Sequence, residues 1–121
     1  MTNWYAVAVG FLVELVVGGI GALFPGVGQL AAGLFGGLVA GVLAGGGWAR
    51  GAWHGLLAGS IGGIVLAVIL GALVSAVGAV GLGPLGPILG GSVFLFALFV
   101  AVVMGVESAL AGAVGGWIAT K

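Results

Sequence analysis

Apolar residues fill four long segments of the chain, and runs rich in glycine and proline separate these segments. The segments span residues 4–24, 29–44, 52–80 and 89–118. Apolar helices of about 20 residues cross the hydrocarbon core of a bilayer. The segments lack the strict alternation of polar and apolar residues that is typical of transmembrane β-strands. The pattern therefore predicts an all-α integral membrane bundle, a single domain over residues 1–121, with four transmembrane helices arranged as two hairpins.

The last two segments are longer than a bilayer crossing requires. At about 1.5 Å per residue, a helix of about 30 residues exceeds the ~30 Å hydrocarbon core, so these helices must tilt, kink or project. The glycine- and proline-rich stretch 81–91 between them predicts an apolar loop. Such a loop could re-enter the protein or lie at the membrane surface, because irregular backbone is excluded from lipid.

Charged and aromatic residues gather on one side of the predicted topology. With four crossings, the N-terminus, the middle loop and the C-terminus share a side, which also holds Arg50, Lys121 and the interfacial His54. Tryptophan is enriched at membrane interfaces, and basic residues mark the cytoplasmic face. We therefore expect a multi-pass protein of the cell membrane with both termini cytoplasmic. Its expected interface anchors are Trp4, Trp48, Trp53 and Trp117.

Composition narrows the classes of function. Only four of the 121 residues are charged at neutral pH, whereas about a quarter are charged in a typical soluble domain. Nucleic-acid binding is excluded because it requires a patch of lysine and arginine. The chain has no cysteine, and no serine, histidine and acid combine into a catalytic pattern. We expect no enzyme activity, no cofactor and no metal site.

Glycine occupies 29 positions, many of them four residues apart. Small residues at this spacing form a groove along a helix and allow two helix backbones to approach closely. In the third segment the row continues through Ala67, Ser75 and Ala79. The spacing predicts glycine-zipper packing. The expected packing positions are Gly33, Gly37, Gly41, Gly45, Gly51, Gly55, Gly59, Gly63 and Gly71.

Two glutamates lie within the first and last segments. Counting along each helix from the shared side places Glu14 and Glu107 about 15 Å deep, near the membrane midplane. A charge at that depth is costly, so we expect both acids to be protonated unless a cation binds. Two interpretations stay open. The acids either form hydrogen bonds between helices or make a proton or cation site.

The last helix has two faces that both favour contact with protein. One face carries Glu107, and the opposite face carries Gly105, Gly112 and Gly116. We expect a four-helix bundle on its own to leave one of these faces against lipid. This reasoning predicts a homo-oligomer.

Two stretches carry a resemblance to a known family. Residues 24–33 read FPGVGQLAAG and residues 51–59 read GAWHGLLAG. The chain resembles a family of small glycine-rich membrane proteins of halophilic archaea that is defined only as a domain of unknown function. The resemblance implies a membrane setting. It implies no activity and no functional residues.

Three hypotheses follow. The first is a non-enzymatic, homo-oligomeric integral membrane protein with a structural or accessory role, whose partners are membrane lipid and copies of itself. The second is a proton or cation channel or carrier that uses Glu14 and Glu107. The third is a lipid-binding or accessory subunit of a larger membrane complex. Polar side chains are scarce within the segments, which disfavours a hydrated transport path and places the first hypothesis ahead of the second.

Overall fold

The computed structural model describes the whole chain, residues 1–121, as four α-helices without any β-strand. The helices are α1 (Trp4–Gly21), α2 (Val27–Ala44), α3 (Trp48–Leu82) and α4 (Leu85–Ile118). The predicted all-helical fold is confirmed. All four helices are long and apolar enough to cross a membrane, which indicates a multi-pass membrane protein.

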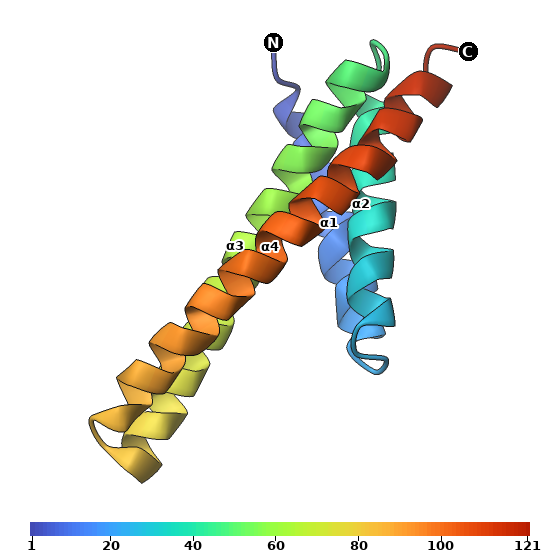
Figure 1. Cartoon of the computed structure of the whole chain (residues 1–121). Coiled ribbons are helices and arrows are strands. Elements are labelled where there is room, and N and C mark those ends of the chain that lie inside the picture. The colour runs from blue at the N-terminus through green and yellow to red at the C-terminus, as the bar shows by residue number, and fades with distance from the viewer.

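The helices form two antiparallel pairs of different length (Figure 1). Helices α1 and α2 have 18 residues each, whereas α3 and α4 have 35 and 34. The short pair lies against the part of the long pair that is nearest the termini (Figure 1). Leu70 of α3 and Val93 of α4 still line a cavity with Gln29 of α2. The part of α3 and α4 between these two residues, 71–92, extends away from the short pair (Figure 1) and is called the distal arm below.

Both termini and the connection between α2 and α3 lie at the same end of the molecule (Figure 1). Helix α1 packs against α2 and α3, and α4 packs against the same two helices. All four helices therefore meet near the termini. This region is called the junction below.

The first connection differs from its predicted position. Helix α1 ends at Gly21 instead of residue 24, and α2 begins at Val27 instead of residue 29. The residue before a proline is disfavoured in a helix, so Phe24 cannot easily extend α1 toward Pro25. Gly26 then adopts a φ of 88°, a conformation that glycine reaches without steric cost and that reverses the chain.

The predicted apolar loop over residues 81–91 is wrong. Helix α3 continues to Leu82 and α4 begins at Leu85, so the connection is only Gly83 and Pro84. Gly83 has a φ of 58°, which permits the tight reversal. Pro87 lies in the first turn of α4, where its missing N–H costs no intrahelical hydrogen bond. Helix α3 likewise starts at Trp48, four residues before the expected start at residue 52.

Small residues make up most of the interior. The largest side chains with almost no exposed surface are Val7, His54 and Ser108. The large aliphatic and aromatic side chains point outward instead. This arrangement suits a lipid environment, where apolar side chains gain little by leaving the hydrocarbon and helices associate through close backbone contact and hydrogen bonds.

Candidate functional site

Ser108 on α4 links three helices at the junction. Its side chain has 0% of its surface exposed. Its Oγ lies 3.1 Å from Oε1 of Glu14 on α1 and 2.8 Å from the backbone carbonyl oxygen of Gly55 on α3. Both distances are suitable for hydrogen bonds. Glu14 itself is 6% exposed, so the contact lies deep within the bundle.

The two contacts of Ser108 bear on the protonation of Glu14. A serine hydroxyl has one hydrogen, and a backbone carbonyl or an ionised carboxylate can only accept. Ser108 can therefore donate to Gly55 or to an ionised Glu14, but not fully to both. If Glu14 is protonated, its O–H donates to Ser108 Oγ while Ser108 donates to the Gly55 carbonyl. The geometry thus favours the neutral acid.

Glu107 lies beside Ser108 in the sequence and faces α2. A Cβ added to Gly33 would lie 3.6 Å from the Glu107 carboxyl carbon, whereas one added to Gly36 would overlap the Glu14 side chain. Gly33 and Gly36 are within one turn of α2, so the two carboxyl groups lie at a similar level. Oε2 of Glu107 is buried and has no hydrogen-bond partner. The structure therefore brings the two predicted acids into one region, with different surroundings.

Several glycines of α2 and α3 face α4 at close range. A Cβ on Gly37 or Gly55 would overlap the backbone of Ser108, and one on Gly41 would overlap that of Gly112. The same type of contact recurs along α3. Added Cβ atoms there would meet Gly112 and Gly116 from Gly51, Ser108 from Gly59, Ala101 from Gly63 and Phe94 from Gly71. Gly45 differs from the other predicted positions, because it follows the last residue of α2 and an added Cβ would meet only open space.

The contacts of α4 bear on the predicted homo-oligomer. The glycine face of α4 meets α3 through Gly112 and Gly116, and Glu107 meets α2. The two faces of α4 thus find part of their contacts within a single chain. On the face of Glu107, however, Val103 and Val114 stay half exposed, so the predicted homo-oligomer stays a prediction.

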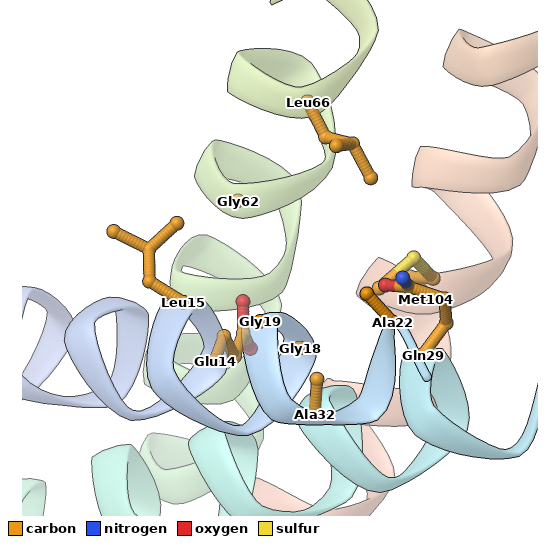
Figure 2. Close-up of a pocket in the computed structure, with 10 residues that line it drawn as sticks. All are labelled: Glu14, Leu15, Gly18, Gly19, Ala22, Gln29, Ala32, Gly62, Leu66 and Met104. Atoms are coloured by element: carbon orange, nitrogen blue, oxygen red, sulfur yellow. The ribbon is translucent and has the colours of Figure 1, made fainter. Parts of the chain in front are cut away.

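A pocket of about 300 Å³ lies beside Glu14 (Figure 2). It is formed by α1, the start of α2, and parts of α3 and α4. Its lining is Glu14, Leu15, Gly18, Gly19, Ala22, Gln29, Ala32, Gly62, Leu66 and Met104. The pocket has two polar side chains, Glu14 on α1 and Gln29 on α2. Glu14 contacts Ser108, whereas Gln29 makes no side-chain hydrogen bond within the chain.

A family model of unknown function, DUF5518, matches residues 4–118. The chain belongs to the DUF5518 family. The match includes all four helices, the two acids and the pocket. No curated protein and no solved structure matches the chain. Membership of the DUF5518 family confirms the expectation of a domain of unknown function. It assigns no activity to the site.

His54 of this DUF5518 chain has only 1% of its surface exposed. Its position at the membrane interface stays a prediction. Nε2 of His54 accepts a hydrogen bond of 2.7 Å from the backbone N–H of Asn3, and Nδ1 donates to the carbonyl of Arg50 at 2.7 Å. Both bonds require the neutral tautomer with hydrogen on Nδ1. His54 therefore ties the start of α1 to α3.

The four tryptophans lie at the end of the molecule that contains the termini, and all are more than half exposed except Trp53, which is half exposed. Nε1 of Trp53 donates a hydrogen bond of 3.1 Å to Thr2 Oγ1. Sequence reasoning placed the tryptophans on a common side but missed the roles of Ser108, Gln29 and His54. Counting residues along a helix gives depth, whereas these roles depend on which helices become neighbours.

Proposed function

We propose that this protein is a non-enzymatic, homo-oligomeric integral membrane protein with a structural or accessory role. The contact between Glu14, Ser108 and Gly55 supports the structural role most directly. It uses the buried acid to hold α1, α3 and α4 together. Hydrogen bonds between membrane helices contribute about 0.6–2 kcal/mol, enough to set the register of closely packed helices.

The proposed packing is a glycine zipper that acts both between two hairpins, α1–α2 and α3–α4, and within the second of them. Close approach of Gly41 to Gly112 supports it for α2 and α4, and that of Gly51 to Gly116 supports it for α3 and α4. Small residues allow such approach, and backbone Cα–H···O contacts add to the attraction.

The proposal of a homo-oligomer now depends on the distal arm. Helices of 35 and 34 residues are about 50 Å long and must tilt strongly to fit a hydrocarbon core of about 30 Å. Packing against neighbouring helices sets such tilt. Because α1 and α2 do not extend along the arm (Figure 1), we propose that another copy supplies these neighbours.

The proposed setting is the cell membrane of a halophilic archaeon, with both termini in the cytoplasm. Its support is the resemblance described above and the position of Arg50 and Lys121 on the side of the termini. The tryptophans would lie at the cytoplasmic interface, where indole rings are favoured.

A flux assay in liposomes tests the structural role. Proton and monovalent-cation flux would be measured for the wild type and for Glu14→Gln, which retains hydrogen bonding but cannot titrate. We expect wild-type flux to equal that of empty liposomes. Flux that is lost in Glu14→Gln, with the fold retained, would overturn the structural role.

A proton or cation site is the second candidate function. The observation that favours it is the buried Glu107 Oε2 without a partner, close to a second acid. Intramembrane acids commonly mark paths for ions or protons. Glu107→Gln in the same flux assay separates the candidates, because a role for this acid predicts loss of flux in that variant while Ser92→Ala, a substitution in the distal arm, retains it.

A further inference from the structure

One carboxyl oxygen of Glu14 is free to bind a ligand. Oε1 contacts Ser108, whereas Oε2 makes no hydrogen bond within the chain. Oε2 lies next to Gly62, which lines the same pocket as Glu14, and an added Cβ on Gly62 would lie 2.5 Å from it. Figure 2 shows Glu14 at the wall of this pocket. A carboxyl group with 6% exposure therefore has one oxygen inside the structural network and one beside the pocket.

The pocket continues along α3 and α4. A second cavity of about 240 Å³ shares Gln29, Leu66 and Met104 with the first. Beyond these residues its lining is almost entirely apolar and includes Val100 and Phe96. Together the cavities form a groove with Glu14 at one end, Gln29 where the two cavities meet, and a hydrocarbon surface at the other end. Such a shape suits an amphiphile with a small head.

The chemistry of the polar end selects the head group. If Glu14 donates its proton to Ser108, Oε2 is a carbonyl oxygen that accepts hydrogen bonds. A phosphate head is negatively charged and has no strong donor to offer it. Calcium prefers six or more oxygen ligands and magnesium about six. Glu14 and Gln29 supply fewer than either cation needs. An ammonium head would favour ionised Glu14. The ionised carboxylate would then compete with the Gly55 carbonyl for the single hydroxyl hydrogen of Ser108. A hydroxyl donates to Oε2 and leaves the network intact.

We propose that the groove between α1, α2 and the α3–α4 pair binds a long-chain alcohol. Its hydroxyl donates to Oε2 of Glu14 and its hydrocarbon chain lies along Leu66, Met104 and the apolar lining of α4. The proposal adds a ligand to a carboxyl group that also has the proposed structural role. It depends on the protein residing in a membrane and not on the absence of ion flux.

Photolabelling tests the proposal directly. The probe is a long-chain alcohol with a diazirine in its chain, added to the purified full-length protein in detergent micelles. We expect labelling at Leu66, Met104 and nearby residues of α4. An excess of the unlabelled alcohol should reduce it at least tenfold, whereas the methyl ether of the same chain, which cannot donate a hydrogen bond, should not. Equal competition by the two compounds would overturn the proposal.

A matched pair of glycine variants removes the dependence on Glu14. Both Gly19 and Gly81 are helical, and an added Cβ at either would meet no atom within 4 Å. Gly19 lines the pocket, whereas Gly81 lies at the end of the distal arm. Gly19→Leu should therefore fill the pocket and reduce specific labelling at least tenfold, and Gly81→Leu should label as the wild type does. Unchanged labelling in Gly19→Leu would contradict the proposal.

Variants of Glu14 separate the ligand from the structural role. Glu14→Gln keeps an acceptor oxygen for the alcohol and an N–H for Ser108, so we expect labelling to persist. Glu14→Leu removes both interactions and should lose labelling and thermal stability together. If Gly19→Leu keeps wild-type stability and wild-type labelling, the ligand proposal fails while the structural role stands. Ion flux that requires Glu14 would instead overturn the structural role and leave the photolabelling result unaffected.

Discussion

The junction and the distal arm solve the same packing problem with different chemistry. At the junction, four helices meet around Ser108, Glu14 and His54, and hydrogen bonds join helices that are far apart in sequence. In the arm, α3 and α4 approach closely at small residues, as at Gly78 and Gly86. No side-chain hydrogen bond joins the two arm helices. Ser92 of the arm donates instead to the Ile88 carbonyl of its own helix.

This difference shows what glycine and polar groups each provide in lipid. Small residues permit two helices to approach closely. They fix the rotation and register of the helices only loosely, because the large apolar side chains are equally stable against lipid in other arrangements. A buried hydrogen bond between helices adds directional specificity. We therefore expect the junction to define the fold, and the arm to tolerate changes more readily.

The largest expected effect comes from filling a glycine contact at the junction. In Gly55→Leu, the new side chain would overlap the Ser108 backbone and separate α3 from α4 at the polar network. Overpacking of this kind costs about 3 kcal/mol or more when backbone cannot move. Unfolding by SDS titration in mixed micelles, followed by tryptophan fluorescence, measures the loss, because every tryptophan lies at the junction end.

The corresponding change in the arm is Gly78→Leu. Here an added Cβ would lie 2.8 Å from the Cα of Gly86, so the arm helices must move apart locally. We expect at most a third of the loss seen for Gly55→Leu. Spin labels at Leu73→Cys and Leu89→Cys, in a chain that has no native cysteine, report the separation of the arm helices. An equal loss of stability for both glycine variants would break the proposed distinction between the regions.

The second prediction concerns Ser108→Ala. The change removes the hydroxyl that contacts Glu14 and Gly55 and leaves a buried carboxyl oxygen without this partner. We expect a loss of about 1–3 kcal/mol in the free energy of unfolding. Ser92→Ala in the arm is the matched control, since it removes only an exposed bond within one helix and should change stability by less than about 0.5 kcal/mol. Similar values for the two variants would contradict a structural role for Ser108.

The overall fold could be predicted from the sequence more readily than the site. Four long apolar segments are enough to predict four helices, because bilayer thickness fixes their minimum length. The ends were less predictable. Gly83 and Pro84 suffice to reverse the chain, so the glycine- and proline-rich stretch 81–91 did not mark a long loop. A proline in the first turn of a helix looks like a helix breaker in the sequence but is compatible with the helix.

The candidate site was predictable only in part. The depth of Glu14 and Glu107 follows from helical rise and a count of residues, and the structure places both acids beside one turn of α2. Ser108 could not be selected among the serines, because its importance depends on α1 and α3 meeting α4 at that position. The same limit applies to Glu107, whose nearness to Gly33 of α2 depends on which helices become neighbours.

The third prediction concerns the tie between the N-terminus and α3. His54→Phe keeps a ring of similar shape but cannot accept from the Asn3 N–H or donate to the Arg50 carbonyl. We expect a loss of about 1 kcal/mol, because two part-buried hydrogen bonds are removed. Hydrogen exchange at the first turn of α1 should become faster, while exchange in the distal arm stays unchanged. Faster exchange throughout the chain would mean that His54 supports the whole junction.

The smallest expected effect lies at the exposed C-terminus. The ammonium group of Lys121 lies 4.5 Å from the ring centroid of Trp117, a geometry suited to a cation–π contact. At an exposed site such a contact contributes about 0.5–1 kcal/mol, and salt weakens it further. Lys121→Ala should therefore change the SDS-unfolding midpoint less than Ser108→Ala does, and the difference should shrink in high salt. Lys121 is exposed, whereas Ser108 contacts three helices at the centre. A loss of stability as large as that of Ser108→Ala would therefore show that the junction depends on its surface as much as on its buried hydrogen bonds.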